Sequence, residues 1–300
     1  MRIIVAVDPA ADSDWAEETL RVFPLIDPLD VVLVCALDIP RPPLTSPGRT
    51  ARGLYGGAIA TLRAQAQRAA EQVAESLKIR LTTRVTSVTA RIVKGRPALA
   101  ILQAATSWKA DIILTGSSGQ NAVSRAILGS VSDEVVWRAP CPVLVVKRRI
   151  ASFQRVLAAT DGSLHADAAL RFLARLPLPP SAEVRVCAVT ETPPPPALIP
   201  PPGRDRWQRL LPLVAELERR AALQSIAKAQ GLMAALSCRI QSSLRIGNPA
   251  HELADEVNRW VPDLLVMGAR GRTSGPDTAL GSVAEAVLRA TRCPTLVARA

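Results

Sequence analysis

The chain has 300 residues and a formal net charge of +11, which is spread evenly, with 19 basic and 13 acidic residues in 1–150 and 18 basic and 13 acidic in 151–300. This length suggests about two domains of roughly 150 residues each. Aromatic residues make up only 3% of the chain. Nucleic-acid binders usually concentrate basic charge in one patch and often add aromatic side chains for stacking. The composition therefore argues against nucleic acid as a partner.

The amino-terminal segment and the cysteines exclude further classes. The first apolar run ends before Asp8 and Pro9, so it is too short for the apolar region of a signal peptide. No apolar stretch approaches the roughly 20 residues that span a bilayer. Five cysteines without a CxxC pair argue against a zinc site and against a disulfide framework. We therefore expect a cytoplasmic protein without a membrane partner.

Short apolar runs alternate with longer amphipathic stretches along the first half of the chain. In chain order, we expect strands at 3–7, 31–37, 85–93, 112–114 and 143–146, and helices at 14–23, 54–78, 97–108 and 130–137. The apolar runs lack in-out alternation, which is typical of strands buried on both faces of a parallel sheet. Strand-helix alternation predicts right-handed βαβ crossovers and a doubly wound α/β domain.

The second half of the chain repeats the first. Equivalent residues lie 152 positions apart in the pairs Gly95/Gly247, Gly116/Gly268, Gly129/Gly281 and Cys141/Cys293. Its strands are expected at 156–159, 184–189, 238–246, 264–267 and 295–298. A fixed internal period indicates a repeated unit, so we expect domains at 1–150 and 151–300, joined by a short link.

Two Pro-rich segments, 39–53 and 192–207, follow the second strand of each copy. Proline cannot join the interior of a sheet and favours extended conformations. We expect surface loops at both places, and a lid or a partner-binding motif is the alternative.

The stretches 116–130 and 268–282 share the spacing G-x2-G-x9-G-S. Both follow a fourth strand and precede a helix, at the sheet edge where α/β folds bind ligands. Glycines let successive backbone N–H groups form an anion-binding concavity, and the helix start adds its own amides. If strands one and four are neighbours, Asp8 faces the first stretch and can bond a ribose while the loop holds phosphates. The P-loop and dinucleotide fingerprints are absent, so this is a separate nucleotide-binding pattern.

These motifs carry a resemblance to a known family. The first strands read "VAVD" and "AATDGS", the fourth strands "DIILTGSSG" and "DLLVMGARG", and the endings "GSVSDEVVWRAPCPVLVV" and "GSVAEAVLRATRCPTLVA". Over both halves the chain resembles a tandem universal stress protein of the nucleotide-binding branch. The resemblance implies two tandem doubly wound domains of the adenine nucleotide alpha hydrolase-like type, each a five-stranded parallel sheet of order 3-2-1-4-5. It also implies an internal pseudo-dimer with antiparallel fifth strands, and leaves a homodimer open.

The same resemblance implies an ATP site, with or without Mg²⁺, in each copy. Phosphate contacts fall on Gly116, Gly119, Gly129 and Ser130, and again on Gly268, Gly271, Gly281 and Ser282. Ribose or adenine contacts fall on Asp8 and Asp161, and adenine contacts on Ala36 and Val189.

The two copies differ from each other at these positions. Copy one has Asp8-Pro9 where the family commonly has Asp followed by a small residue, whereas copy two keeps Asp161-Gly162-Ser163. Copy two also carries Arg270 and Arg272 in its glycine stretch. Because arginine adds charge-assisted hydrogen bonds to phosphate, we hypothesise that copy two binds polyphosphate more tightly.

The expected function is adenine-nucleotide binding in a stress response, with occupancy of the site biasing a surface for an unidentified protein partner. A nucleotide-independent interaction or chaperone-like module and a slow ATPase are the alternatives. No catalytic residue and no metal ligand is assigned. His165 and His251 each stand near a helix start without partners at metal-ligand spacing. Efficient phosphoryl transfer needs a positioned nucleophile, charge clamps and usually a metal. The sequence offers only the glycine stretches and a few arginines for this, so binding is favoured over catalysis.

Overall fold

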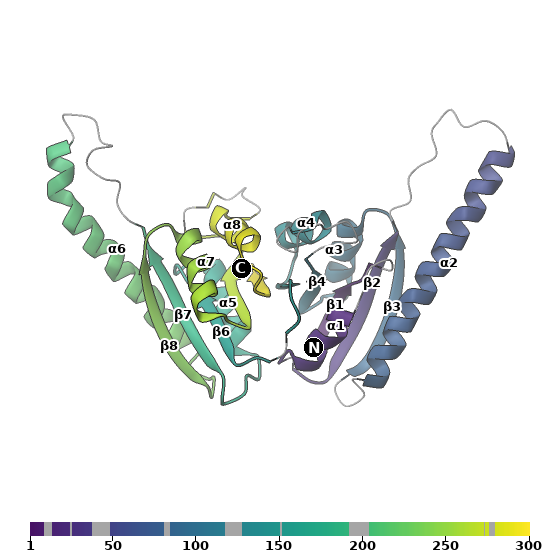
Figure 1. Cartoon of the computed structure of the whole chain (residues 1–300), viewed down its shortest axis with the longest axis horizontal. Coiled ribbons are helices and arrows are strands. Elements are labelled where there is room, and N and C mark those ends of the chain that lie inside the picture. The colour runs from purple at the N-terminus through teal and green to yellow at the C-terminus, as the bar shows by residue number, and fades with distance from the viewer. Residues whose placement is uncertain are drawn as a thin grey trace. The chain divides into compact units, whose positions relative to one another are not determined.

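A computed structural model describes residues 1–8, 14–24, 26–37, 49–80, 85–117, 128–150, 152–191, 204–272, 274–275 and 280–300. The chain divides into two compact units, Met1–Ala151 and Ser152–Ala300 (Figure 1). Each unit has its own buried apolar core. In the part of the chain that the structure describes, no helix is both long and apolar enough to cross a membrane.

Unit 1 is a five-stranded parallel sheet with four helices in its described part. The order along the chain is β1 (Arg2–Ala6), α1 (Asp14–Val22), β2 (Leu29–Leu37), α2 (Arg49–Arg80), β3 (Val85–Lys94), α3 (Pro97–Trp108), β4 (Ile112–Gly116), α4 (Ser130–Arg138) and β5 (Val143–Val146). In the sheet the strand order is β3-β2-β1-β4-β5.

Unit 2 repeats this arrangement. Its elements are β6 (Arg155–Ala159), α5 (Leu164–Ala174), β7 (Glu183–Thr190), α6 (Arg204–Leu232), β8 (Arg239–Ile246), α7 (Pro249–Trp260), β9 (Leu264–Gly268), α8 (Ser282–Ala290) and β10 (Thr295–Ala298). The strand order is β8-β7-β6-β9-β10, and all neighbours are parallel. The predicted fold class and the 3-2-1-4-5 order are thus confirmed in both units.

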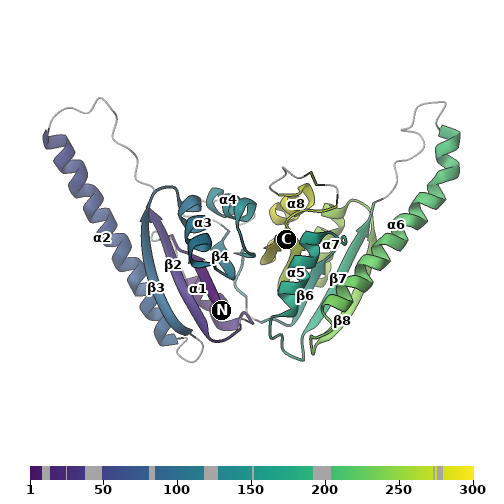
Figure 2. The same cartoon turned by 180° about the vertical axis from the view of Figure 1, so that it is seen from behind.

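Helices cover both faces of each sheet. In unit 2, α5 and α6 pack together on one face and α7 and α8 on the other (Figures 1 and 2). The central strands are therefore buried on both sides, and β4 and β9 each have four consecutive buried residues. This is the physical reason for the continuous apolar runs in the sequence.

The helices α2 and α6 begin earlier than the sequence predicted. Residues 49–53 and 204–207 were expected to be loop, but they form the first turns of these helices. The run after each proline cluster is rich in arginine, which is a strong helix former. The prolines lie just before these helix starts, so they do not interrupt them. The rest of the two Pro-rich segments, 38–48 and 192–203, lies outside the described residues.

Candidate functional site

A cavity of about 350 Å³ opens at the carboxyl edge of the sheet in unit 2. Its walls come from the ends of β6, β7 and β9, from the glycine stretch 268–282, and from α6, α7 and the start of α8. All seven residues that the sequence assigned to a ligand in this copy line the cavity: Asp161, Val189, Gly268, Arg270, Gly271, Gly281 and Ser282.

Asp161 connects the end of β6 to the glycine stretch. The strands β6 and β9 are hydrogen-bonded neighbours, so their carboxyl ends meet at one place. The Asp161 carboxylate accepts hydrogen bonds from the backbone N–H of Arg272 at 2.8 Å and from that of Ser163 at 3.0 Å. A Cβ on Gly271 would lie 2.9 Å from the same carboxylate. Only glycine permits this close approach without a local shift.

The first turn of α5 packs directly on Gly268. A Cβ at Gly268 would lie 2.5 Å from the backbone nitrogen of Ala166. The Ser163 hydroxyl accepts a hydrogen bond from that same N–H at 3.2 Å, as a helix N-cap, and donates to the carbonyl of Arg270 at 3.2 Å. The start of α5 and the glycine stretch are therefore fixed to each other.

The far end of the glycine stretch is fixed as well. The N–H of Gly281 donates to the carbonyl of Ala269 at 2.8 Å, which brings the amino terminus of α8 to the cavity wall. Ser282 is the first residue of α8. Backbone amides at a helix start, together with the helix dipole, favour an anion at this place.

Charged side chains of both signs reach the cavity. Arg270 and Arg272 come from the glycine stretch, Glu191 from the end of β7 and Glu218 from α6. A guanidinium nitrogen of Arg272 lies 3.5 Å from a Glu218 carboxylate oxygen, with about half of each side chain exposed. This ion pair links α6 to the glycine stretch.

His165 lies near the charges of Arg270, Arg299 and Asp161. Its Nδ1 accepts a hydrogen bond from the backbone N–H of Ala300 at 2.9 Å. Burial, followed by the nearby charges of Arg270 and Arg299, lowers the pKa of His165, while Asp161 acts in the opposite direction. The neutral imidazole is thus the favoured form.

The remaining cavity wall is largely apolar. It includes Ala159, Cys187, Val214, Leu253 and Met267. Burial, with a smaller effect of Glu256, raises the pKa of the Cys187 thiol to about 12, so this thiol stays protonated and is no nucleophile at neutral pH. These side chains offer an apolar surface to a flat ring.

Unit 1 shows the same framework at its described positions. Gly129 donates to the carbonyl of Ser117 at 2.6 Å, as Gly281 does to Ala269. Asp8 follows β1, Ala36 lies near the end of β2, and Ser130 begins α4. A Cβ at Gly116 would lie 3.4 Å from the Trp15 indole, which is ordinary contact. Gly119 falls in 118–127, outside the described residues.

Several residues that line the cavity were not anticipated from the sequence. Glu191, Val214, Glu218, Pro249 and Leu253 all belong to this group. Val214 and Glu218 are one helical turn apart on α6, and Pro249 and Leu253 are one turn apart on α7. An i, i+4 pair shows that two side chains share a helix face, but only the packing of the helix on the sheet shows what that face meets.

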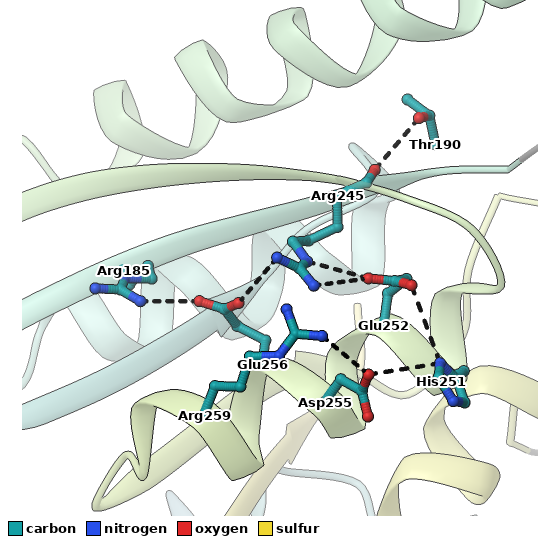
Figure 3. Close-up of polar contacts among 8 residues, drawn as sticks. All are labelled: Arg185, Thr190, Arg245, His251, Glu252, Asp255, Glu256 and Arg259. Atoms are coloured by element: carbon teal, nitrogen blue, oxygen red, sulfur yellow. Dashed lines mark hydrogen bonds and ion pairs between the residues drawn. The ribbon is translucent and has the colours of Figure 1, made fainter.

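A cluster of ion pairs holds α7 on β7 and β8 (Figure 3). Glu256, which is 5% exposed, lies 2.9 Å from Arg185 and 3.9 Å from Arg245. Arg245 also contacts Glu252 at 3.0 Å, and the Arg185 guanidinium stacks on Trp260 at 4.2 Å. The cluster therefore fixes α7 on the sheet, and α7 contributes Leu253 to the cavity wall.

Unit 1 replaces this ionic cluster with apolar residues. By the strand registers and the repeat distance, the positions of Arg185, Arg245, Glu252 and Glu256 correspond to Val32, Val93, Ala100 and Ala104. The same helix-sheet contact is therefore built in two chemically different ways within one chain.

His251, in the first turn of α7, lies 3.8 Å from Asp255 and 4.0 Å from Glu252, with 71% of its side chain exposed. Over the residues that the structure describes, no group of three or more histidine, cysteine or acidic side chains is arranged to hold a metal ion.

Comparison with known proteins identifies the repeated unit. The sequence model of the universal stress protein family matches residues 1–147 and again 152–299. A universal stress protein of Thermus aquaticus is 45% identical over 86 residues, which cover 29% of this chain and 61% of that protein. One from Methanocaldococcus jannaschii is 27% identical over 147 residues, which cover 49% of this chain and 82% of that protein.

Solved structures share the fold over nearly the whole chain. A universal stress protein from Archaeoglobus fulgidus matches with a TM-score of 0.64 at 18% identity, covering 99% of this chain and 96% of that one. A putative universal stress protein from Pseudomonas aeruginosa matches with a TM-score of 0.61 at 16% identity, covering 99% and 92%. Two matched domains in one chain fit an internal pseudo-dimer.

Proposed function

This chain belongs to the universal stress protein family, and we propose that it binds ATP, or a related adenine nucleotide, in the cavity of unit 2. Membership of the family supports a role in stress response. The observation that carries the proposal is the convergence of all seven assigned residues of copy two on one cavity. Ligand sites in α/β folds lie at this edge of the sheet.

The chemistry of the cavity suits a nucleotide. Backbone amides of the glycine stretch and of the α8 start, with Arg270 and Arg272, would hold the phosphates through charge-assisted hydrogen bonds. Asp161 would accept hydrogen bonds from the ribose hydroxyls. The apolar wall that includes Val189 and Leu253 would receive the base. The protein thus supplies binding and orientation, and nucleotide occupancy serves as the signal.

Unit 1 is proposed as the weaker site. It keeps the glycine framework, but Ser118 and Gln120 stand in the sequence where unit 2 has Arg270 and Arg272. Each charge-assisted hydrogen bond to phosphate contributes about 1.5–3 kcal/mol in a protein, so the loss of two guanidinium groups lowers the affinity substantially.

The test is to denature the freshly purified protein, identify the released small molecules by mass spectrometry, and titrate nucleotide-free protein with Mg-ATP by calorimetry. The variants R270A/R272A and, as the matched change in unit 1, S118A/Q120A are measured in parallel. We expect released adenine nucleotide and a tight site that is lost only in R270A/R272A. Absence of nucleotide on release together with no heat of binding rejects the proposal.

A further inference from the structure

An exposed ridge of leucines lies on the amino-terminal half of α6. We name Leu210, Leu213 and Leu217 the leucine ridge. Leu213 and Leu217 are each 56% exposed and Leu210 is 38% exposed. Residues at i, i+3 and i+7 lie on one face of a helix, so the three side chains form one continuous apolar strip.

This half of the helix projects beyond the sheet. Both views show α6 extending past the carboxyl ends of β7 and β8 (Figures 1 and 2). From 208 to 220 no α6 side chain is buried, whereas Ala222, Ile226 and Ala229 of the second half are. An exposed large apolar strip rimmed by polar residues is typical of a protein interaction site.

The rim of the ridge is basic. Arg209 is exposed next to Leu210, and Arg219 and Arg220 are 53% and 69% exposed beyond Leu217. Two carboxylates lie among these arginines: Glu216, whose pKa is held at about 2 by hydrogen bonds from Arg219 and Arg220, and Glu218, which pairs with Arg272. The three arginines thus outnumber the two glutamates on the described part of α6 beside the leucines.

Unit 1 provides an internal comparison. In the described side chains of α2 from Gly57 onward, the exposed large apolar residues are Leu62 and Ile79, which are too far apart to form a ridge. The ridge is therefore no requirement of the repeated fold but a feature of α6.

We propose that the leucine ridge is a docking surface for an acidic amphipathic helix of a partner protein. Leucines spaced at helical intervals accept the apolar face of a second helix, and the arginines select a partner with Glu and Asp beside that face. The three leucines do not line the cavity, although Val214 and Glu218 of the same half of α6 do.

The probe is a fluorescein-labelled peptide of about 20 residues, long enough to form a helix, with leucines at i, i+3, i+4 and i+7 and glutamates on its flanks. A peptide with lysines in place of the glutamates and a scrambled peptide are the comparison probes. We expect the acidic peptide to bind the full-length protein at least about tenfold more tightly than either, since charge and the apolar strip both contribute.

Protein variants assign the binding to the ridge. L213E/L217E should weaken binding of the acidic peptide at least about tenfold. The control is L223E on the same helix, where Leu223 is 41% exposed. Its side chain points about 120° away from that of Leu217 around the helix axis, so we expect less than a twofold change in binding. Because all three positions are exposed, circular dichroism should be the same for all variants.

Three results would overturn the proposal. The first is an acidic peptide that binds no better than the scrambled one, or equally well to L213E/L217E. The second is a wild-type dimer, measured by light scattering, that L213E/L217E converts to a monomer, because a second copy would then cover the ridge. The third is binding to phosphatidylglycerol vesicles that depends on the ridge, because the occupant would then be a membrane.

Discussion

The Asp161 carboxylate accepts a hydrogen bond from the backbone N–H of Arg272 over 2.8 Å, which joins the end of β6 to the glycine stretch 111 residues later. The same carboxylate lies 2.9 Å from where a Cβ of Gly271 would stand. With the carboxylate in this position, a side chain at residue 271 would need a local shift. This pairing places the loop amides and the carboxylate on the wall of one cavity.

Asp161→Ala should weaken Mg-ATP binding about tenfold or more. The substitution removes the acceptor for the ribose and releases the loop, and a hydrogen bond to a charged group contributes about 1.5–3 kcal/mol. Calorimetry measures the effect, with Asp8→Ala in unit 1 as the matched control that leaves the tight site unchanged. Equal affinities of Asp161→Ala and wild type would show that the carboxylate has no role in binding.

Glu218→Gln should tighten Mg-ATP binding about two- to fivefold, because an exposed ion pair contributes at most about 1 kcal/mol. In the nucleotide-free protein Arg272 pairs with Glu218, and the substitution frees the guanidinium for phosphate. The control is Glu216→Gln on the same helix; Glu216 pairs with Arg219 and Arg220, and none of these three residues lines the cavity. Weaker binding by Glu218→Gln would mean that this carboxylate contacts the ligand directly.

Gly268→Ala should destabilise unit 2 by about 2–3 kcal/mol, in the range of overpacking changes. The new Cβ would lie 2.5 Å from the backbone nitrogen of Ala166, and this backbone cannot move without shifting α5. Gly116→Ala, with 3.4 Å to the Trp15 ring, is the control and should change the thermal midpoint little. A similar midpoint for both variants would contradict the close packing of α5 on β9.

The ionic cluster of Figure 3 should be sensitive to single changes and tolerant of complete replacement. Glu256→Ala leaves Arg185 and Arg245 without this carboxylate and should cost about 2–3 kcal/mol, below the usual 3–5 for a broken buried pair because the arginines are about a quarter exposed. The quadruple variant R185V/R245V/E252A/E256A carries the residue types of unit 1 at these positions. It should lower the free energy of unfolding by less than Glu256→Ala does. Hydrogen exchange of the β7 and β8 amides in the full chain measures both; the reverse order of stabilities would refute the equivalence of the two contacts.

Acid should destabilise unit 2 through His165. Because the folded-state pKa of His165 lies below its usual 6.5, the unfolded chain binds its proton more tightly. The resulting loss in the free energy of unfolding is absent above about pH 6.5. It grows as the pH falls from there towards the folded-state pKa, and it is complete below that pKa. Thermal midpoints between pH 8 and pH 5 should fall less in His165→Gln than in wild type. The exposed His251→Gln is the control, and identical profiles for all three proteins would exclude this origin.

The sequence predicted most of the fold because its pattern is strong at the relevant places. Apolar runs such as 112–114 and 264–267 mark strands covered on both faces. Because the two halves repeat each other, each such pattern occurs twice and supports the same prediction in both units. The glycine stretches could be located for a similar reason, since their spacing reflects contacts of the backbone, such as that of Gly271 with Asp161.

The parts of the site that tertiary packing contributes were not accessible in this way. Glu218 reaches the cavity because α6 packs on β7, and no local sequence pattern encodes that packing. The starts of α2 and α6 differ from the prediction because the proline clusters favour loops, whereas the arginine-rich run after each cluster is helical.

The most direct test of the nucleotide site is hydrogen exchange by mass spectrometry of the full-length protein with and without Mg-ATP. Binding in the cavity predicts slower exchange of the amides in 268–272 and 280–284 at ligand concentrations that leave unit 1 unaffected. If ATP leaves these amides unchanged at saturating concentration, or protects only a surface away from the cavity, the central claim is contradicted.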